Sequence, residues 1–273
     1  MQIVFLCLLF VLGACLGSFL CCQARRLHLK SKKTQLLGSR SVCLSCKYKL
    51  KWYDNVPIFS WLFLKGKCRK CGKKIGLAEF LSEIGLATAF LLFGFGVSLN
   101  GLTLDAVLVR PAELAVFGLT LTFIVGLAFL AIYDGIYGQL PLHALIFCLI
   151  CAVIIVVLRE WGYFSSPEIL RQNLINIFFA VLILGGLYLA LYLVSKGKWV
   201  GDGDWILGAI LALVLGTPWL ALITLFLANF IACITMAPIV KKDHHKKIYF
   251  GPFMAIAFII VFSFSAFFNS LLG

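Results

Sequence analysis

The chain has 273 residues, of which 62% are hydrophobic, and its mean hydropathy is +1.05. A soluble domain of this composition would expose too much apolar surface, so the sequence predicts an all-α polytopic membrane protein. The formal net charge is +13. Because the basic residues gather between apolar runs, membrane topology and anionic lipid explain them, and we expect a lipid bilayer rather than a nucleic acid as partner.

Apolar runs alternate with short polar segments along the chain and predict about eight transmembrane helices. The first starts at Met1 without a basic segment or a small-residue cleavage site, so we interpret it as a retained span rather than a signal peptide. The sixth has only 12 residues and is interpreted as a tilted or re-entrant span. The runs are Ile3–Cys22, Glu79–Leu99, Leu114–Tyr133, Leu142–Leu158, Leu174–Val194, Trp205–Gly216, Leu220–Val240 and Phe253–Leu272.

The distribution of basic residues predicts the orientation. Fifteen of the 24 lysines and arginines lie between Gln23 and Ala78. If eight runs alternate, this segment shares one side of the membrane with the loops after the fifth and seventh runs, which contain Lys196, Lys198, Lys241, Lys242, Lys246 and Lys247. Only Arg110, Arg159 and Arg171 fall on the other side. The positive-inside rule then makes the basic side cytoplasmic and places both termini outside.

These patterns predict three parts: a first transmembrane span at 1–22, a cytoplasmic insert at 23–78, and a transmembrane core at 79–273. The insert contains two Cys-x-x-Cys pairs separated by 21 residues. Each pair can present two thiolates to one tetrahedral ion, which predicts a closed structural zinc site. A small insert buries little core, so the metal would contribute most of its stability. The four predicted ligands are Cys43, Cys46, Cys68 and Cys71.

Two disulfides or four free thiols are the alternatives for the insert, and disulfides would require an oxidising compartment. The remaining cysteines are interpreted as small buried apolar residues, including Cys148 and Cys151, whose Cys-x-x-Cys spacing falls within an apolar span.

Two aspartates lie at the ends of apolar runs. Asp134 ends the third run and Asp204 opens the sixth. Two complete runs separate them, so the chain returns to the same face, and both are expected at the cytoplasmic boundary. Carboxylates in such places usually have a partner or a function, and a pair that meets predicts the acid/base dyad of an aspartyl protease.

The surroundings of the aspartates fit that chemistry. Gly135 and Gly138 follow the first, and Gly201 and Gly203 precede the second, which allows close backbone approach. We expect a helix N-terminus to stabilise Asp204 and expect Asp134, at a helix C-terminus, to lack that support. The alternative is that both are ordinary helix-boundary residues. Asp202, in the same turn as Asp204, is interpreted as a solvated loop residue.

Ordered motifs along nearly the whole chain resemble the type IV prepilin leader peptidases, also called prepilin peptidase/N-methyltransferases. Glu83 matches the acidic residue that the family has at the start of the second span. The other matching segments are Gly17-Ser18-Phe19-Leu20 with Arg26, the paired cysteines with Pro57, Ser60-Trp61 and Gly66-Lys67-Cys68-Arg69, Asp134 with Leu140-Pro141, Gly201-Asp202-Gly203-Asp204, and Phe250-Gly251-Pro252-Phe253.

The chain departs from the family pattern at Cys21, where Asn is usual, at Ile206, where Lys is common, and at Leu142, where Asp or Asn is frequent. None of these changes removes a catalytic carboxylate. The first falls in the N-terminal region that the family associates with methylation.

The resemblance implies a multi-pass protein of the bacterial inner membrane, with Asp134 and Asp204 as its catalytic residues. The enzyme would remove the basic leader of type IV prepilins or pseudopilins at the cytoplasmic face. It would then use S-adenosylmethionine to methylate the new N-terminus. No glycine-rich nucleotide loop supports methylation independently.

Three other interpretations stay open. Preflagellin peptidases share the aspartate pair but generally lack the cysteine insert. Presenilin-like proteases share Tyr133-Asp134 and the Gly-x-Gly-Asp pattern, but require a Pro-Ala-Leu motif that is replaced here by Phe250–Phe253. A membrane transporter or scaffold with a zinc clip would use the aspartates to bind protons or cations.

Overall fold

The computed structural model describes residues 2–31, 42–43, 45–99, 110–161, 166–197, 200–240 and 249–272. Within these ranges the chain is helical and contains no β-strand, only two isolated antiparallel bridges, Val42–Lys49 and Lys67–Lys74. The prediction of an all-α membrane protein is confirmed. Lys198, the lysines at 241, 242, 246 and 247, and residues 32–41 and 44 of the insert lie outside these ranges.

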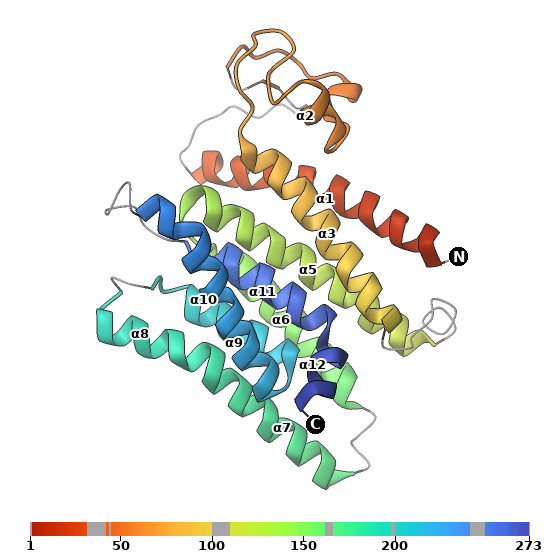
Figure 1. Cartoon of the computed structure of the whole chain (residues 1–273), viewed down its shortest axis with the longest axis vertical. Coiled ribbons are helices and arrows are strands. Elements are labelled where there is room, and N and C mark those ends of the chain that lie inside the picture. The colour runs from red at the N-terminus through yellow and green to blue at the C-terminus, as the bar shows by residue number, and fades with distance from the viewer. Residues whose placement is uncertain are drawn as a thin grey trace. The chain divides into compact units, whose positions relative to one another are not determined.

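Among the described residues, six helical segments are long and apolar enough to cross a membrane. A bent pair, α11 and α12, would make a seventh span, and α9 is a shorter apolar helix. The six are α1 (Gln2–Ser31), α3 (Leu77–Leu99), α5 (Pro111–Tyr137), α6 (Leu142–Glu160), the continuous segment α7 (Pro167–Val181), η3 (Leu182–Gly186) and α8 (Leu187–Ser195), and α10 (Pro218–Val240) (Figure 1).

Three predicted runs differ in detail from regular spans. The fifth contains the π-helical turn η3. The sixth is α9 (Asp204–Leu215), whose 12 residues cover about 18 Å, too little for a hydrocarbon layer of about 30 Å. The eighth is broken: α11 (Gly251–Ser263) and α12 (Ser265–Leu272) meet at 71° because Phe264 leaves the helical conformation.

The chain divides into two compact units, Met1–Leu91 and Leu92–Gly273. In the first, α1 crosses α3 closely: a Cβ added to Gly13 would lie 2.6 Å from the carbonyl oxygen of Leu86. Two short helices, η1 (Trp52–Asn55) and α2 (Phe59–Phe63), belong to the insert. The insert is held to α3, because the Ile58 amide donates a 2.6 Å hydrogen bond to the Glu83 carboxylate.

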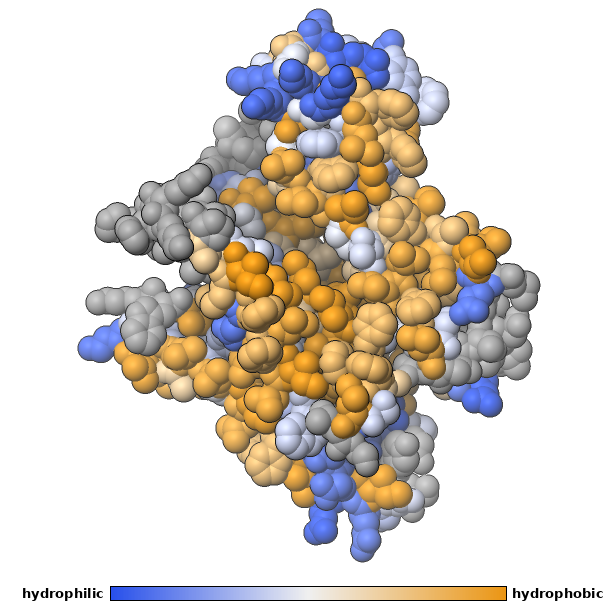
Figure 2. Space-filling view, in the orientation of Figure 1, coloured by the Kyte–Doolittle hydropathy of each residue, from blue (hydrophilic) through white to orange (hydrophobic). Residues whose placement is uncertain are grey.

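In the second unit, α9 is the central helix and contacts α6, α7, η3, α8, α10 and α11 (Figure 1). Most of its side chains are buried. Large apolar side chains remain exposed on the surrounding helices, among them Ile150, Phe178 and Phe226. Hydrophobic residues dominate the face of the helices seen in Figure 2, whereas hydrophilic residues gather over the insert. This inverted polarity is expected of helices that face lipid.

Candidate active site and metal centre

Asp134 lies in the last turn of α5 and is buried, with 5% of its surface exposed. Its Oδ2 accepts a 3.0 Å hydrogen bond from the main-chain amide of Gly251, the first residue of α11. The carboxylate therefore faces the N-terminus of a second helix, where the helix dipole favours negative charge. The expectation that Asp134 lacks helix-dipole support is wrong, because the supporting helix lies 117 residues away in sequence.

Asp204 is the first residue of α9 and is also buried, with 7% of its surface exposed. Its side chain accepts a 2.9 Å hydrogen bond from the amide of Gly201, and its own amide donates to the carbonyl of Gly201. This turn lies close to the loop between α5 and α6, since a Cβ on Gly203 would lie 2.8 Å from the Cβ of Leu140. Asp202 is exposed, as a solvated loop residue would be.

The second unit brings the two aspartates together, close enough for their charges to interact. Each is buried and each carboxylate retains one backbone amide donor. Two carboxylates that share such a site cannot both ionise easily, so one tends to keep a proton. The pair can therefore supply a base and an acid at the same place.

Tyr188 of α8 is a further polar group at this site, and no motif in the sequence indicates it. It is 1% exposed, and its hydroxyl lies within range of the Asp204 charge. Asn229 of α10 donates a 3.3 Å hydrogen bond to that hydroxyl. Tyr188 follows the π-turn η3, which shifts the helical register, so a regular 3.6-residue pattern does not indicate which face it occupies.

The four cysteines of the insert come together in two similar backbone turns. The carbonyl oxygen of Cys43 accepts a hydrogen bond from the amide of Lys47, and the carbonyl oxygen of Cys68 accepts one from the amide of Gly72. Lys47 and Gly72 both adopt positive φ, at 56° and 68°. The bridges Val42–Lys49 and Lys67–Lys74 flank these turns. The two pairs are therefore built as matching knuckles, as the spacing predicted.

The ligand atoms of Cys43, Cys46, Cys68 and Cys71 all lie within 4.8 Å of one another, and the Sγ atoms of Cys43 and Cys71 are 3.9 Å apart. A tetrahedral ion with bonds of about 2.3 Å to sulfur requires separations of about 3.8 Å between sulfurs. Hydrogen bonds from the backbone of Cys46 and then Ser45 lower the pKa of Cys43 to about 6. Such a thiol is readily deprotonated, which favours metal binding, whereas desolvation and hydrogen bonds with the other three thiols raise the pKa of Cys71 to about 11.

The other cysteines are free, and only some fit the prediction that they are buried. Cys21, Cys148 and Cys151 are buried, but Cys7, Cys15 and Cys233 are exposed. The prediction failed for the exposed ones because an apolar segment in a membrane protein often faces lipid rather than the protein interior.

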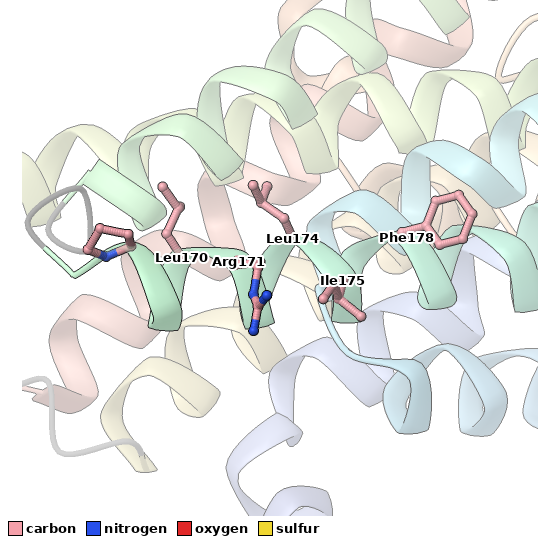
Figure 3. A pocket seen from close by; sticks show the side chains of 6 residues that line it. Leu170, Arg171, Leu174, Ile175 and Phe178 are labelled. Atoms are coloured by element: carbon pink, nitrogen blue, oxygen red, sulfur yellow. The ribbon is translucent and has the colours of Figure 1, made fainter.

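An open groove follows the outer side of α7, and all its lining residues come from that helix (Figure 3). Neither aspartate lines it. The groove is part of the apolar surface and is not the candidate active site. It is lined by Pro167, Leu170, Arg171, Leu174, Ile175 and Phe178.

Several known proteins that resemble this chain share one name, and one family model matches its N-terminal part. Residues 11–96 match the family model described as the bacterial peptidase A24 N-terminal domain. A relative from Aeromonas salmonicida, named prepilin leader peptidase/N-methyltransferase, is 31% identical over 230 residues, which is 83% of this chain and 72% of the relative. A relative of the same name from Bacillus subtilis is 30% identical over 79% of this chain and 76% of its own length.

A third relative of this name, from Myxococcus xanthus, is 42% identical over 85 residues. That alignment covers 31% of this chain and only 24% of the relative, so the likeness is local. No solved structure matches the chain.

Proposed function

Because this chain belongs to the prepilin leader peptidase/N-methyltransferase family, we propose that it is a membrane-embedded aspartyl endopeptidase. Its substrates would be type IV prepilins or pseudopilins, from which it removes the short basic leader. The observations that carry the proposal are that Asp134 and Asp204 are both buried, that each is held by one backbone amide, and that they lie near enough for the charge of Asp204 to act on Asp134.

In the proposed reaction, the ionised aspartate takes a proton from water, and the protonated aspartate donates a hydrogen bond to the scissile carbonyl oxygen. The water oxygen then attacks the carbonyl carbon and gives a tetrahedral intermediate. The aspartate that took the proton from water then passes it to the leaving nitrogen, the C–N bond breaks, and the leader is released with a new C-terminal carboxyl group. The amides of Gly201 and Gly251 hold the carboxylates in place throughout.

The proposed site lies at the cytoplasmic face of the bacterial inner membrane. Lys196, at the end of α8, is on the same side of the bundle as the start of α9, and the positive-inside rule makes that side cytoplasmic. A substrate with a basic leader and an apolar helix would leave the leader in the cytoplasm while its helix enters the bilayer.

We propose that the four-cysteine cluster holds one structural Zn²⁺, because four sulfur ligands at tetrahedral spacing leave no open coordination position. The ion would stabilise the insert rather than take part in cleavage.

N-methylation of the new N-terminus with S-adenosylmethionine is proposed only because the relatives carry methyltransferase in their names. The described residues contain no strand that a glycine-rich nucleotide loop would follow, so the chain offers no site of that kind there.

The test is cleavage of a prepilin co-expressed with this chain, followed as a gel shift. Wild type should cleave it, and Asp134→Asn and Asp204→Asn should not, while both variants insert into the membrane normally. Normal turnover by either variant would refute the dyad. If wild type is inactive and ion flux depends on Asp134, the transporter interpretation is favoured instead.

A further inference from the structure

The helix that carries Asp204 ends inside the bundle. Gly203, just before α9, packs on Leu140, just before α6, so the two helices start side by side. From Leu142 to Arg159, α6 rises about 25 Å, whereas α9 rises only about 15 Å from Asp204 to Val214. The last turn of α9 thus lies roughly 10 Å short of the end of its neighbour.

A helix end at this depth leaves carbonyl groups that water does not satisfy. The chain provides two hydrogen-bond donors for these carbonyl groups. Gly216, at a φ of 75°, donates its amide to the carbonyl of Ala212 over 3.0 Å. The carbonyl of Val214 accepts a 2.9 Å hydrogen bond from Nη1 of Arg159, whose side chain reaches back along α6. A cation at a helix C-terminus is also favoured by the helix dipole.

Arg159 is itself held in place. Its Nε donates a 3.0 Å hydrogen bond to Oε1 of Glu160, which is 6% exposed. The other oxygen of Glu160 accepts a 2.7 Å hydrogen bond from Asn173 of α7. Gly216 leaves room for the guanidinium, since a Cβ there would lie 2.5 Å from an Nη atom of Arg159. Polar contacts therefore join α6 and α7 to the end of α9.

The rest of the α9 surface gives weaker control over its position along its own axis. It packs through small residues: Gly208 lies against the carbonyl of Leu184, and Ala209 lies against Gly185. Apolar contacts of this kind are not directional, so they hold the helix in the core but define its axial position poorly. A charge-assisted hydrogen bond has a defined length and direction.

We propose that Arg159 is a positioning residue for the aspartate pair: by capping the C-terminus of α9, it fixes the depth of this short helix and hence the position of Asp204 at its other end. The inference rests on the proposed peptidase function, although the anchoring itself can be measured without activity.

The experiment compares the full-length protein in detergent or nanodiscs as wild type, Arg159→Met, Arg159→Lys and Gly216→Ala. The last variant keeps every charge but crowds the guanidinium. Arg171→Met is the matched control, because Arg171 is an exposed cation on α7, on the same side of the membrane by the predicted topology. Cleavage gives kcat and KM for folded enzyme, and amide hydrogen exchange reports on residues 201–207 and 210–216.

We expect Arg159→Met and Gly216→Ala to lower kcat about 10- to 100-fold, because a displacement of about 1 Å at a reacting group has effects of that order. KM should stay within about twofold, because in this scheme the substrate is bound by other surfaces. Arg159→Lys, which retains one cationic donor, should recover part of the loss. Exchange should accelerate at both ends of α9 in Arg159→Met, and Arg171→Met should match wild type.

A kcat of Arg159→Met within about twofold of wild type would overturn the proposal. The proposal would also be overturned if the loss of activity in Arg159→Met disappears when rates are expressed per folded molecule. An equal loss of kcat in Arg171→Met would overturn it as well. If wild type cleaves no prepilin, the peptidase function fails, but exchange still decides the anchoring: acceleration at residues 201–207 supports it, and an unchanged pattern refutes it.

Discussion

The main-chain amide of Gly251 donates a 3.0 Å hydrogen bond to the carboxylate of Asp134. This contact relates the Phe250–Phe253 segment to the candidate active site, because Gly251 begins α11 and directs the N-terminus of that helix at the carboxylate. A Cβ at this position would lie 2.7 Å from Oδ2 of Asp134, so any side chain larger than glycine would displace the carboxylate. The adjacent Pro252 lies 3.5 Å from where a Cβ on Gly135 would be, so α5 and α11 are close at this level.

Replacing Gly251 by Ala should displace the Asp134 carboxylate and lower the rate of prepilin cleavage about 100-fold, since the catalytic group loses its position. The measurement is kcat for purified enzyme. Gly118→Ala in α5 is the control, because a Cβ there meets nothing within 4 Å. Equal rates for Gly251→Ala and Gly118→Ala would show that the contact is unimportant.

Removing the hydroxyl of Tyr188 should lower cleavage about tenfold or more while leaving the fold intact. The ring remains to fill the core and contact Phe250, whose centroid is 6.0 Å away, but Asp204 loses a nearby hydroxyl dipole. Rates should be compared between Tyr188→Phe and Tyr192→Phe, which removes a hydroxyl one helical turn further along α8. A reduced rate in both variants alike would argue against a specific role.

Cys43→Ser should reduce the zinc content from about one ion per chain to near zero, because three sulfur ligands hold the ion much less tightly than four. Elemental analysis of purified protein measures this directly. Cys233→Ser, at an exposed cysteine outside the cluster, should retain its zinc. Undiminished zinc in Cys43→Ser would exclude the four-cysteine site.

Asp54→Ala should destabilise the insert by about 1–3 kcal/mol, because it removes a buried acceptor. Asp54 is 8% exposed, accepts a 2.8 Å hydrogen bond from Arg69 and a 3.2 Å hydrogen bond from the amide of Lys51. The rate of zinc release to a chelator should rise accordingly.

The control for Asp54→Ala is Glu113→Ala, which breaks an ion pair whose Arg110 side chain is 69% exposed. Pairs of that kind contribute about 0–1 kcal/mol, so zinc release should not change. Identical release rates in the two variants would contradict the structural importance of Asp54.

The sequence by itself determined the membrane class, the helical fold, the family and the pairing of the cysteine knuckles. These are consequences of local composition and spacing: long apolar runs must be helical in lipid, and Cys-x-x-Cys pairs form matching turns. The even number of crossings between Asp134 and Asp204 also predicts that both lie at the same membrane face, whereas their approach within that face depends on how α5, α9 and α11 pack.

Only the tertiary structure decided what surrounds those residues. The support that Gly251 gives to Asp134, the approach of Tyr188 to Asp204 and the capping of α9 by Arg159 all join segments distant in sequence. The bend between α11 and α12 and the π-turn η3 likewise cannot be recognised from the hydropathy of the sequence, because both lie within apolar runs. Periodicity reports which face of a helix is apolar, whereas such contacts depend on the depth and rotation at which neighbouring helices pack.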